Sequence, residues 1–140
     1  MEFILDNTWE FPVYYHRTLI DKQIVYISFI KCRSTFSKNS HWYISVVIAS
    51  KKKNILKYFK GEKSLNITGK IGIKGLVYVK NALLEFEKSS IPKTGDYIIV
   101  NWLDNKRRNA YMRLLKYGYN ISYNDGHKSL CKKITNSPTL

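Results

Sequence analysis

The residues best suited to chemistry lie in one short stretch, residues 67–76, which has the sequence ITGKIGIKGL. It holds three glycines and two lysines at the entry to an amphipathic segment: Gly69, Gly72, Gly75, Lys70 and Lys74. Glycines let backbone N–H groups approach an anion closely, and the N-terminus of a following helix adds the positive end of its dipole. This composition is typical of a phosphate-binding turn. The alternative is a flexible helix entry whose lysines are simply solvated.

The established nucleotide-binding fingerprints do not fit this stretch. A P-loop would need glycine at Ser64 and serine or threonine at Ile71, and the dinucleotide-binding pattern would need glycine at Ile71. The stretch therefore indicates a site for a phosphate group without identifying a nucleotide-binding family.

Histidine and cysteine offer little further chemistry. His16, His41 and His127 stand at no metal-ligand spacing with either cysteine. Cys32 and Cys131 form no disulfide framework, which predicts a reduced, cytoplasmic protein. We expect packing roles for these side chains and no metal site.

The chain carries a strong excess of positive charge: 24 Lys and Arg against 10 Asp and Glu, a formal charge of +14. Lysines concentrate in residues 51–80, and a second basic block lies in residues 106–116. A partner that carries phosphates or carboxylates is therefore expected. No apolar run approaches the roughly 20 residues that span a bilayer. The first residues also lack the basic region of a signal peptide, so we expect no membrane partner.

The elements that position the glycine-rich stretch follow from the hydrophobic pattern. With 140 residues, 44% of them hydrophobic, the chain predicts one folded domain, residues 1–140, whose tail 135–140 is flexible. Strands are expected at 11–15, 24–31, 41–49 and 97–103, helices at 54–59, 72–88 and 106–117, and a final hairpin at 119–123 and 128–134.

Each of the two longer helices is expected to bury one stripe of side chains. For the first helix the stripe is Ile73, Leu76, Val77, Leu83 and Leu84. For the second helix it is Ala110, Tyr111, Leu114 and Leu115, followed by Gly118 as a left-handed stop. A strand, a helix and a strand in succession usually return parallel through a right-handed crossover. We therefore expect an α/β or α+β fold: a single mixed, twisted sheet with helices on its faces and a C-terminal β-hairpin.

This succession resembles the acyl-CoA-binding half of the GNAT (N-acetyltransferase) superfamily over residues 41–134. The similarity rests on a strand (WYISVVIAS), a glycine-rich turn that opens a helix (TGKIGIKGLVYVKNALLEFE), a buried strand (YIIVNWLDN), a helix ending in Tyr-Gly-Tyr (RRNAYMRLLKYGY) and the final hairpin. In that family the glycine-rich turn receives the CoA pyrophosphate, and neighbouring strands splay to admit the pantetheine arm. The glycine-rich turn of this chain resembles a divergent version of the family's pyrophosphate loop.

The resemblance implies an acyl-CoA-dependent N-acyltransferase with acetyl-CoA as co-substrate. The cofactor-binding residues it implies are Gly69, Lys70, Gly72, Ile73, Lys74, Val100, Asn101 and Asn105. It also makes Tyr111 the candidate general acid, because a phenol with a pKa of about 10 is suited to return a proton to a thiolate. Since so basic a surface would repel a polycation, we expect an acidic or nucleic-acid-linked acceptor.

Two other interpretations stay open. Residues 69–72 (GKIG) also resemble the GXXG loop of KH domains, which clamp single-stranded nucleic acid, and the lysine excess suits such a partner. A small basic inhibitor or adaptor could have the same scaffold without the chemistry, because fold does not fix function. The sequence leaves the acceptor, the catalytic base and the oligomeric state unassigned.

Overall fold

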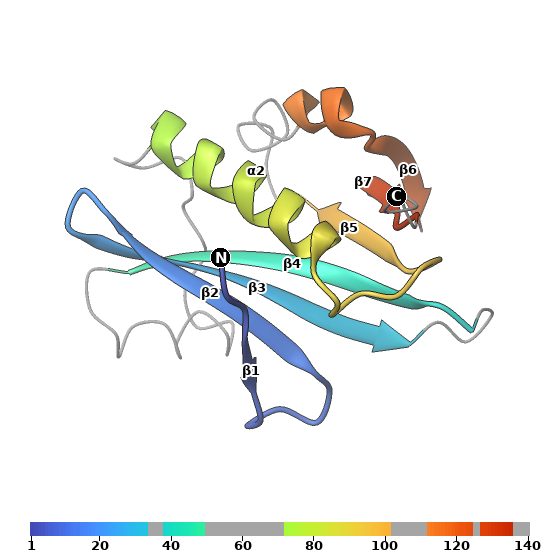
Figure 1. Cartoon of the computed structure of the whole chain (residues 1–140). Helices are drawn as coiled ribbons and strands as arrows, with labels where there is room; N and C mark the ends of the chain where they lie inside the picture. Colours follow the sequence, from blue (N-terminus) through green and yellow to red (C-terminus); the bar gives the residue numbers. More distant parts are fainter. Residues whose placement is uncertain (34–37, 50–71, 102–111, 125–126, 136–140) are drawn as a thin grey trace, which may run out of the picture.

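A computed structural model of the chain describes residues 1–33, 38–49, 72–101, 112–124 and 127–135 (Figure 1). The elements follow in the order β1 (Ile4–Asp6), β2 (Val13–Ile20), β3 (Gln23–Arg33), β4 (Ser40–Ala49), α2 (Gly72–Lys88), β5 (Tyr97–Asn101), the 3-10 helix η1 (Met112–Tyr117), β6 (Asn120–Asn124) and β7 (His127–Lys133). This is a mixed α+β fold. Within the described ranges α2 and η1 are the only helices, fewer than the sequence predicted. The expectations for residues 54–59 and 136–140 lie outside the described residues.

The seven strands form one mixed sheet in the order β1-β2-β3-β4-β5-β7-β6. The first four strands are antiparallel neighbours in sequence order. β4 and β5 are parallel and α2 connects them, so the predicted parallel return is confirmed. β7 pairs antiparallel with both β5 and β6. The parallel pair thus lies inside the sheet, with antiparallel strands on either side.

A two-residue turn joins β2 to β3. Ile20 pairs with Gln23, which leaves Asp21 and Lys22 as the turn. Both residues have positive φ angles, 47° and 65°. These angles are those of a type I′ turn, whose twist matches that of the flanking strands. The turn brings Asp21 to the end of the sheet where α2 begins (Figure 1).

Helix α2 packs across one face of the sheet and closes the hydrophobic core (Figure 1). Its buried residues recur at helical spacing: Gly75, Tyr78, Val79, Ala82, Leu83 and Phe86. Phe86 stacks on Phe29 with ring centroids 3.8 Å apart, and Trp42 meets the Phe86 ring edge-on. The bounds of α2, Gly72–Lys88, agree with the helix expected at 72–88.

The face that α2 buries differs from the expected stripe. Val77 is 45% exposed and Leu84 is only half-buried, whereas Tyr78 and Phe86 are buried. The helix is rotated so that its two aromatic rings face the sheet. Aromatic side chains contribute more buried apolar area than valine or leucine, so this rotation is the more stable one.

The first strands also differ from the sequence expectation. The strand expected at 11–15 is β2, which begins at Val13 and runs to Ile20, and β1 was not expected. Arg17 interrupts the hydrophobic pattern of β2, but it pairs with Tyr26 of β3. Its Nη1 donates to the Tyr26 hydroxyl at 3.4 Å. β2 therefore continues through Arg17, whose side chain reaches across to Tyr26 on the neighbouring strand.

The second helix, expected at 106–117, is described only from Met112, where it is the 3-10 helix η1. Leu114 is buried but Leu115 is 40% exposed, so only one of the two leucines faces the core. The tighter 3-10 winding changes which neighbours share a face. Gly118 follows with a φ of 91°, which is the left-handed conformation predicted for the residue that ends this helix.

Candidate functional site

The described pairing of the parallel strands β4 and β5 covers only part of their length. Their paired positions are His41 with Tyr97, Trp42 with Ile98 and Tyr43 with Ile99. Beyond Tyr43, β4 continues to Ala49, and β5 continues to Asn101, without pairing to each other. The described ladder therefore ends before either strand does, and we call the region between residues 44–49 of β4 and 100–101 of β5, where no pairing between them is described, the opening.

This opening leaves two strand edges facing each other without a ladder of hydrogen bonds. The other edge of β4 stays paired to β3 as far as Ala49, and the other edge of β5 stays paired to β7 through Asn101. Within the described residues no strand lies between them. Backbone N–H and C=O groups need partners, so such edges suit an extended ligand that carries amide groups.

The N-terminus of α2 lies towards the end of the sheet at which β4 finishes. A helix that connects two parallel strands runs antiparallel to them, and Figure 1 shows α2 beginning near the end of β4, whereas β5 finishes beside later turns of α2. Phe86 contacts Trp42, so the last β4–β5 pairs lie about 20 Å along the helix from Gly72, at roughly 1.5 Å per residue. The first turn of α2 contains no acidic residue. The N–H groups of a first helical turn have no acceptor within their own helix, so these groups and the helix dipole favour an anion there.

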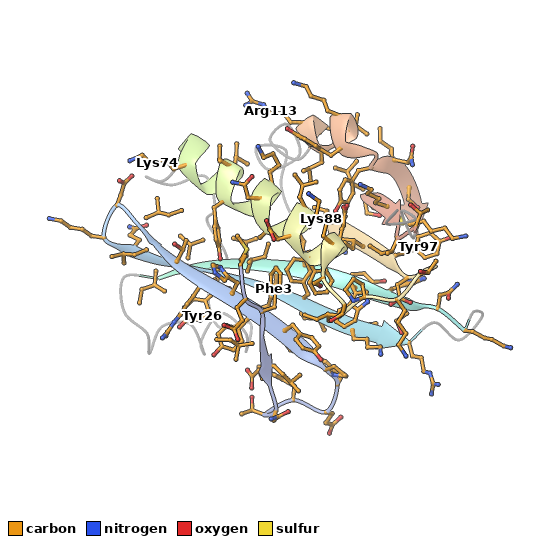
Figure 2. The ribbon with its side chains drawn as sticks, in the orientation of Figure 1. Phe3, Tyr26, Lys74, Lys88, Tyr97 and Arg113 are labelled. Carbon is orange, nitrogen blue, oxygen red and sulfur yellow. The ribbon has the colours of Figure 1, made fainter. Side chains whose placement is uncertain are left out.

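Lys74, one of the predicted cofactor-binding residues, projects from this first turn (Figure 2). Its Nζ lies 2.8 Å from Asp21 Oδ1 at the β2–β3 turn, and the two side chains are 69% and 46% exposed. An ion pair this exposed stabilises the fold little. The ammonium group can therefore move from Asp21 to an anion bound at the start of α2.

Val100 and Asn101 lie on β5 just beyond its last pair with β4. The Val100 side chain is fully buried in the core, so only its backbone can contact a ligand. Asn101 is exposed. Gly72 and Ile73 lie in the first turn of α2. The remaining predicted site residues, Gly69, Lys70, Asn105 and Tyr111, lie outside the described residues.

Tyr43, at the last paired position of β4, is a candidate site residue that the sequence did not single out. It is half-buried, and it lies on the sheet face opposite Trp42 and α2 because strand side chains alternate. Burial raises the pKa of the Tyr43 phenol, and the nearby thiols of Cys32 and Cys131 add to this. The phenol is thus kept protonated beside the opening. No pattern in the neighbouring sequence could have identified Tyr43, because its place at the end of the β4–β5 pairing depends on how β4 aligns with β5.

A groove of about 530 Å³ lies between the first half of α2 and the β2–β3 turn. It is lined by Thr18, Leu19, Ile20, Asp21, Lys74, Val77, Tyr78 and Asn81. The Tyr78 hydroxyl donates to the His16 carbonyl at 3.1 Å and lies 2.7 Å from His16 Nδ1. Burial lowers the pKa of His16, and the N-terminal amine adds to this, so the ring stays neutral. The contact between Tyr78 and His16 holds α2 against β2, so we assign these two residues a structural role.

His41, Cys32 and Cys131 also have described side chains, and each of them packs against neighbouring residues. His41 meets Tyr97 edge-on with ring centroids 5.5 Å apart. Burial raises the pKa of both Cys32 and Cys131, which disfavours the nucleophilic thiolate. Across the described ranges, no group of three His, Cys, Asp or Glu side chains could hold a metal ion.

No protein-family model, no curated protein and no solved structure matches the chain. In the part of the chain that the structure describes, no helix has the length and apolar character needed to cross a membrane. The function is therefore inferred from the arrangement of β4, β5 and α2.

Proposed function

We propose that the protein is an acyl-CoA-dependent N-acyltransferase resembling GNAT proteins, with acetyl-CoA as the acyl donor. The observation that carries the proposal is the end of the β4–β5 pairing at Tyr43 and Ile99, in a parallel pair of strands that α2 connects. The acceptor is an acidic or nucleic-acid-linked molecule. This choice is supported by the formal charge of +14, which would repel a polycationic substrate.

The chemical groups of CoA suit the residues around this opening. The pantetheine arm is extended and carries amide groups, which can pair with the open strand edges as an added strand would. The pyrophosphate is anionic, and the N–H groups at the start of α2, with Lys74 beside them, are suited to bind it. The proposal thus assigns the pantetheine arm to the edges of β4 and β5 and the pyrophosphate to the start of α2.

Acyl transfer at this site needs a base and an acid. The thioester supplies an acyl carbon that an acceptor amine can attack, with the CoA thiolate as the leaving group. A base removes the proton from the amine, and Tyr111 donates its own proton to the thiolate. A phenol with an ordinary pKa of about 10 is matched to this transfer. Tyr43, at the last paired position of β4, is a second candidate for the acid.

Calorimetry with acetyl-CoA tests the binding step. We expect saturable one-to-one binding and a raised melting temperature, and we expect the Gly72→Asp variant to bind more weakly. A carboxylate ~4 Å from the pyrophosphate would cost about 1 kcal/mol or more, which corresponds to a decrease in affinity of about tenfold. An acidic residue in the first turn also stabilises a helix, so the variant should still fold.

Asn81→Asp is the matched control, because it adds the same charge to an exposed position further along α2. It should leave the affinity for acetyl-CoA close to that of the wild type. Absence of both heat and a thermal shift at millimolar acetyl-CoA would rule out the proposed activity.

The Tyr111→Phe variant tests the proposed acid. It should bind acetyl-CoA almost as the wild type does, while turnover falls by about 10²-fold or more, as is usual when a general acid is removed. The comparison requires turnover and binding constants measured on the same preparation. An unchanged turnover rate would show that Tyr111 is not the general acid, and Tyr43→Phe would then be the next variant to measure.

The KH-like interpretation predicts a different outcome for the same Gly72→Asp variant. A GXXG clamp would lose affinity for single-stranded RNA, and acetyl-CoA would produce no heat. The acyltransferase proposal predicts the reverse: RNA affinity is unaffected by this substitution, apart from the small effect of one added charge.

A further inference from the structure

A second pocket, of about 520 Å³, lies at the opposite end of β4 from α2's first turn. It is formed by the turn between β1 and β2, the end of β3, the start of β4 and the turn before β5. Its lining residues are Glu10, Phe11, Pro12, Lys31, Arg33, Lys38, Asn39, Ser40, Lys93, Thr94 and Asp96. Ser40, in this pocket, lies at the opposite end of β4 from Ala49, about 30 Å away at roughly 3.3 Å per residue, and about 10 Å from Tyr43, where the β4–β5 pairing ends.

The pocket is strongly cationic. Four basic side chains line it, namely Lys31, Arg33, Lys38 and Lys93, against the two carboxylates of Glu10 and Asp96. The Asp96 carboxylate accepts hydrogen bonds from the backbone N–H groups of Ser40 and Lys93 and from the Trp42 indole. These hydrogen bonds hold the carboxylate in place, and its charge offsets part of that of Lys31.

Among the described residues, Arg33, Lys38 and Lys93 have no acidic partner, whereas the charge of Lys31 interacts with Asp96. Arg33, Lys38 and Lys93 make no side-chain hydrogen bond or ion pair with another described residue. Lys31 places its Nζ over the Trp42 ring, 5.7 Å from the ring centroid. A concave surface with several such cations concentrates the positive potential and attracts phosphate groups.

An exposed aromatic ring stands at the rim of the same pocket. Phe11 is 43% exposed and lines the pocket. It stacks on Trp9, with ring centroids 6.4 Å apart and planes 17° apart. The Trp9 indole donates to Asp6 Oδ2 at 3.0 Å, which fixes the pair in place. A flat ring supported from behind in this way is a platform on which a base can stack.

We propose that this pocket binds single-stranded nucleic acid, with a backbone phosphate among Lys31, Arg33, Lys38 and Lys93 and a base stacked on Phe11. Cations and an aromatic platform together are the combination that single-strand binding surfaces use. An acidic polypeptide would engage the cations but not the ring, and the bases of an intact duplex are already stacked. The inference does not depend on the acyltransferase proposal, because the two sites share no residue.

Fluorescence anisotropy with a labelled single strand of about ten nucleotides, a length within the range of known single-strand sites, tests the phosphate binding. The affinity of the Arg33→Glu/Lys38→Glu double variant should be lower by about tenfold or more. Its slope of log Kd against log salt should fall by about 0.7 for each phosphate that the variant no longer neutralises. Both residues are exposed, so the variant should fold.

The matched control is the Arg113→Glu/Lys116→Glu double variant. It makes the same change in net charge at exposed positions of η1, and Figure 2 shows Arg113 far from the β1–β2 turn. This control should retain most of the affinity and the wild-type salt slope. Equal decreases in affinity for the two double variants would overturn the proposal, because binding would then follow net charge alone.

Phe11→Ala tests base stacking separately from the charges. It should weaken binding of the single strand by about fivefold or more, while Leu19→Ala, at an exposed position near the β2–β3 turn, should have no effect. A duplex or a polyglutamate peptide should compete poorly. Equal competition by either of them, or an unchanged affinity of Phe11→Ala, would refute the proposal. Acetyl-CoA binding by these variants should stay at the wild-type level, so failure here is distinguishable from failure of the acyltransferase proposal.

Discussion

Asp96 illustrates how one buried side chain joins distant parts of the sheet. Its carboxylate links the start of β4 to the turn before β5 through hydrogen bonds from Ser40, Trp42 and Lys93. Burial raises the pKa of Asp96, but these hydrogen bonds and the charge of Lys31 lower it more, so the pKa lies below its ordinary value. The ionised carboxylate is therefore the form that the folded state favours.

The Asp96→Asn substitution should destabilise the fold. Both carboxylate oxygens of Asp96 accept hydrogen bonds, whereas the NH₂ group of an asparagine cannot accept one. The donors that face this NH₂ group would lose their acceptor, and leaving buried polar groups unpaired costs about 1–3 kcal/mol. Urea denaturation at neutral pH measures this destabilisation. An unchanged free energy of unfolding would show that these hydrogen bonds are energetically neutral.

The same hydrogen bonds predict a pH dependence with a definite sign. Because the pKa of Asp96 is depressed in the folded state, its contribution is complete above the unfolded value of 3.8 and declines as the pH falls below it. The stability difference between wild type and Asp96→Asn should therefore narrow as the pH is lowered from about 5 to about 2. A difference that grew on acidification would contradict this assignment.

At the scale of the elements, the sequence predicted where α2 begins and ends but not which face it buries. Gly72 at its start, and Pro92 and Gly95 after its end, mark its bounds locally. Its apolar residues, however, form two overlapping stripes, and only the shape of the sheet decides between them. Phe29 and Trp42 on the sheet select the face that carries Phe86. The register that opens β4 from β5 is likewise a long-range property, which no local pattern encodes.

Two alanine substitutions on α2 test which face packs on the sheet. Leu83→Ala should cost about 2–5 kcal/mol because Leu83 is fully buried in the core. Val77→Ala should change stability by less than ~0.5 kcal/mol because Val77 is largely exposed. Thermal or chemical denaturation of the two variants provides the comparison. Equal destabilisation would mean that α2 is rotated from the orientation described.

At the scale of the whole molecule, β4 connects two regions of different chemistry. Its later part, past the last pair with β5, leads towards the start of α2, where we propose that acetyl-CoA binds. The other end opens into the basic pocket with its aromatic rim. The mixed sheet was predictable because the strand-helix-strand succession restricts the topology. The basic pocket was not, because its lining comes from four separate segments of the chain.

The most direct test of the acyltransferase account is an amide NMR titration of the labelled protein with acetyl-CoA. The account predicts saturable shifts concentrated at residues 44–49, 72–74 and 100–101, the open edges of β4 and β5 and the first turn of α2, with the amides around Arg33 and Phe11 unaffected. No shifts at millimolar acetyl-CoA, or shifts confined to the basic pocket, would contradict it.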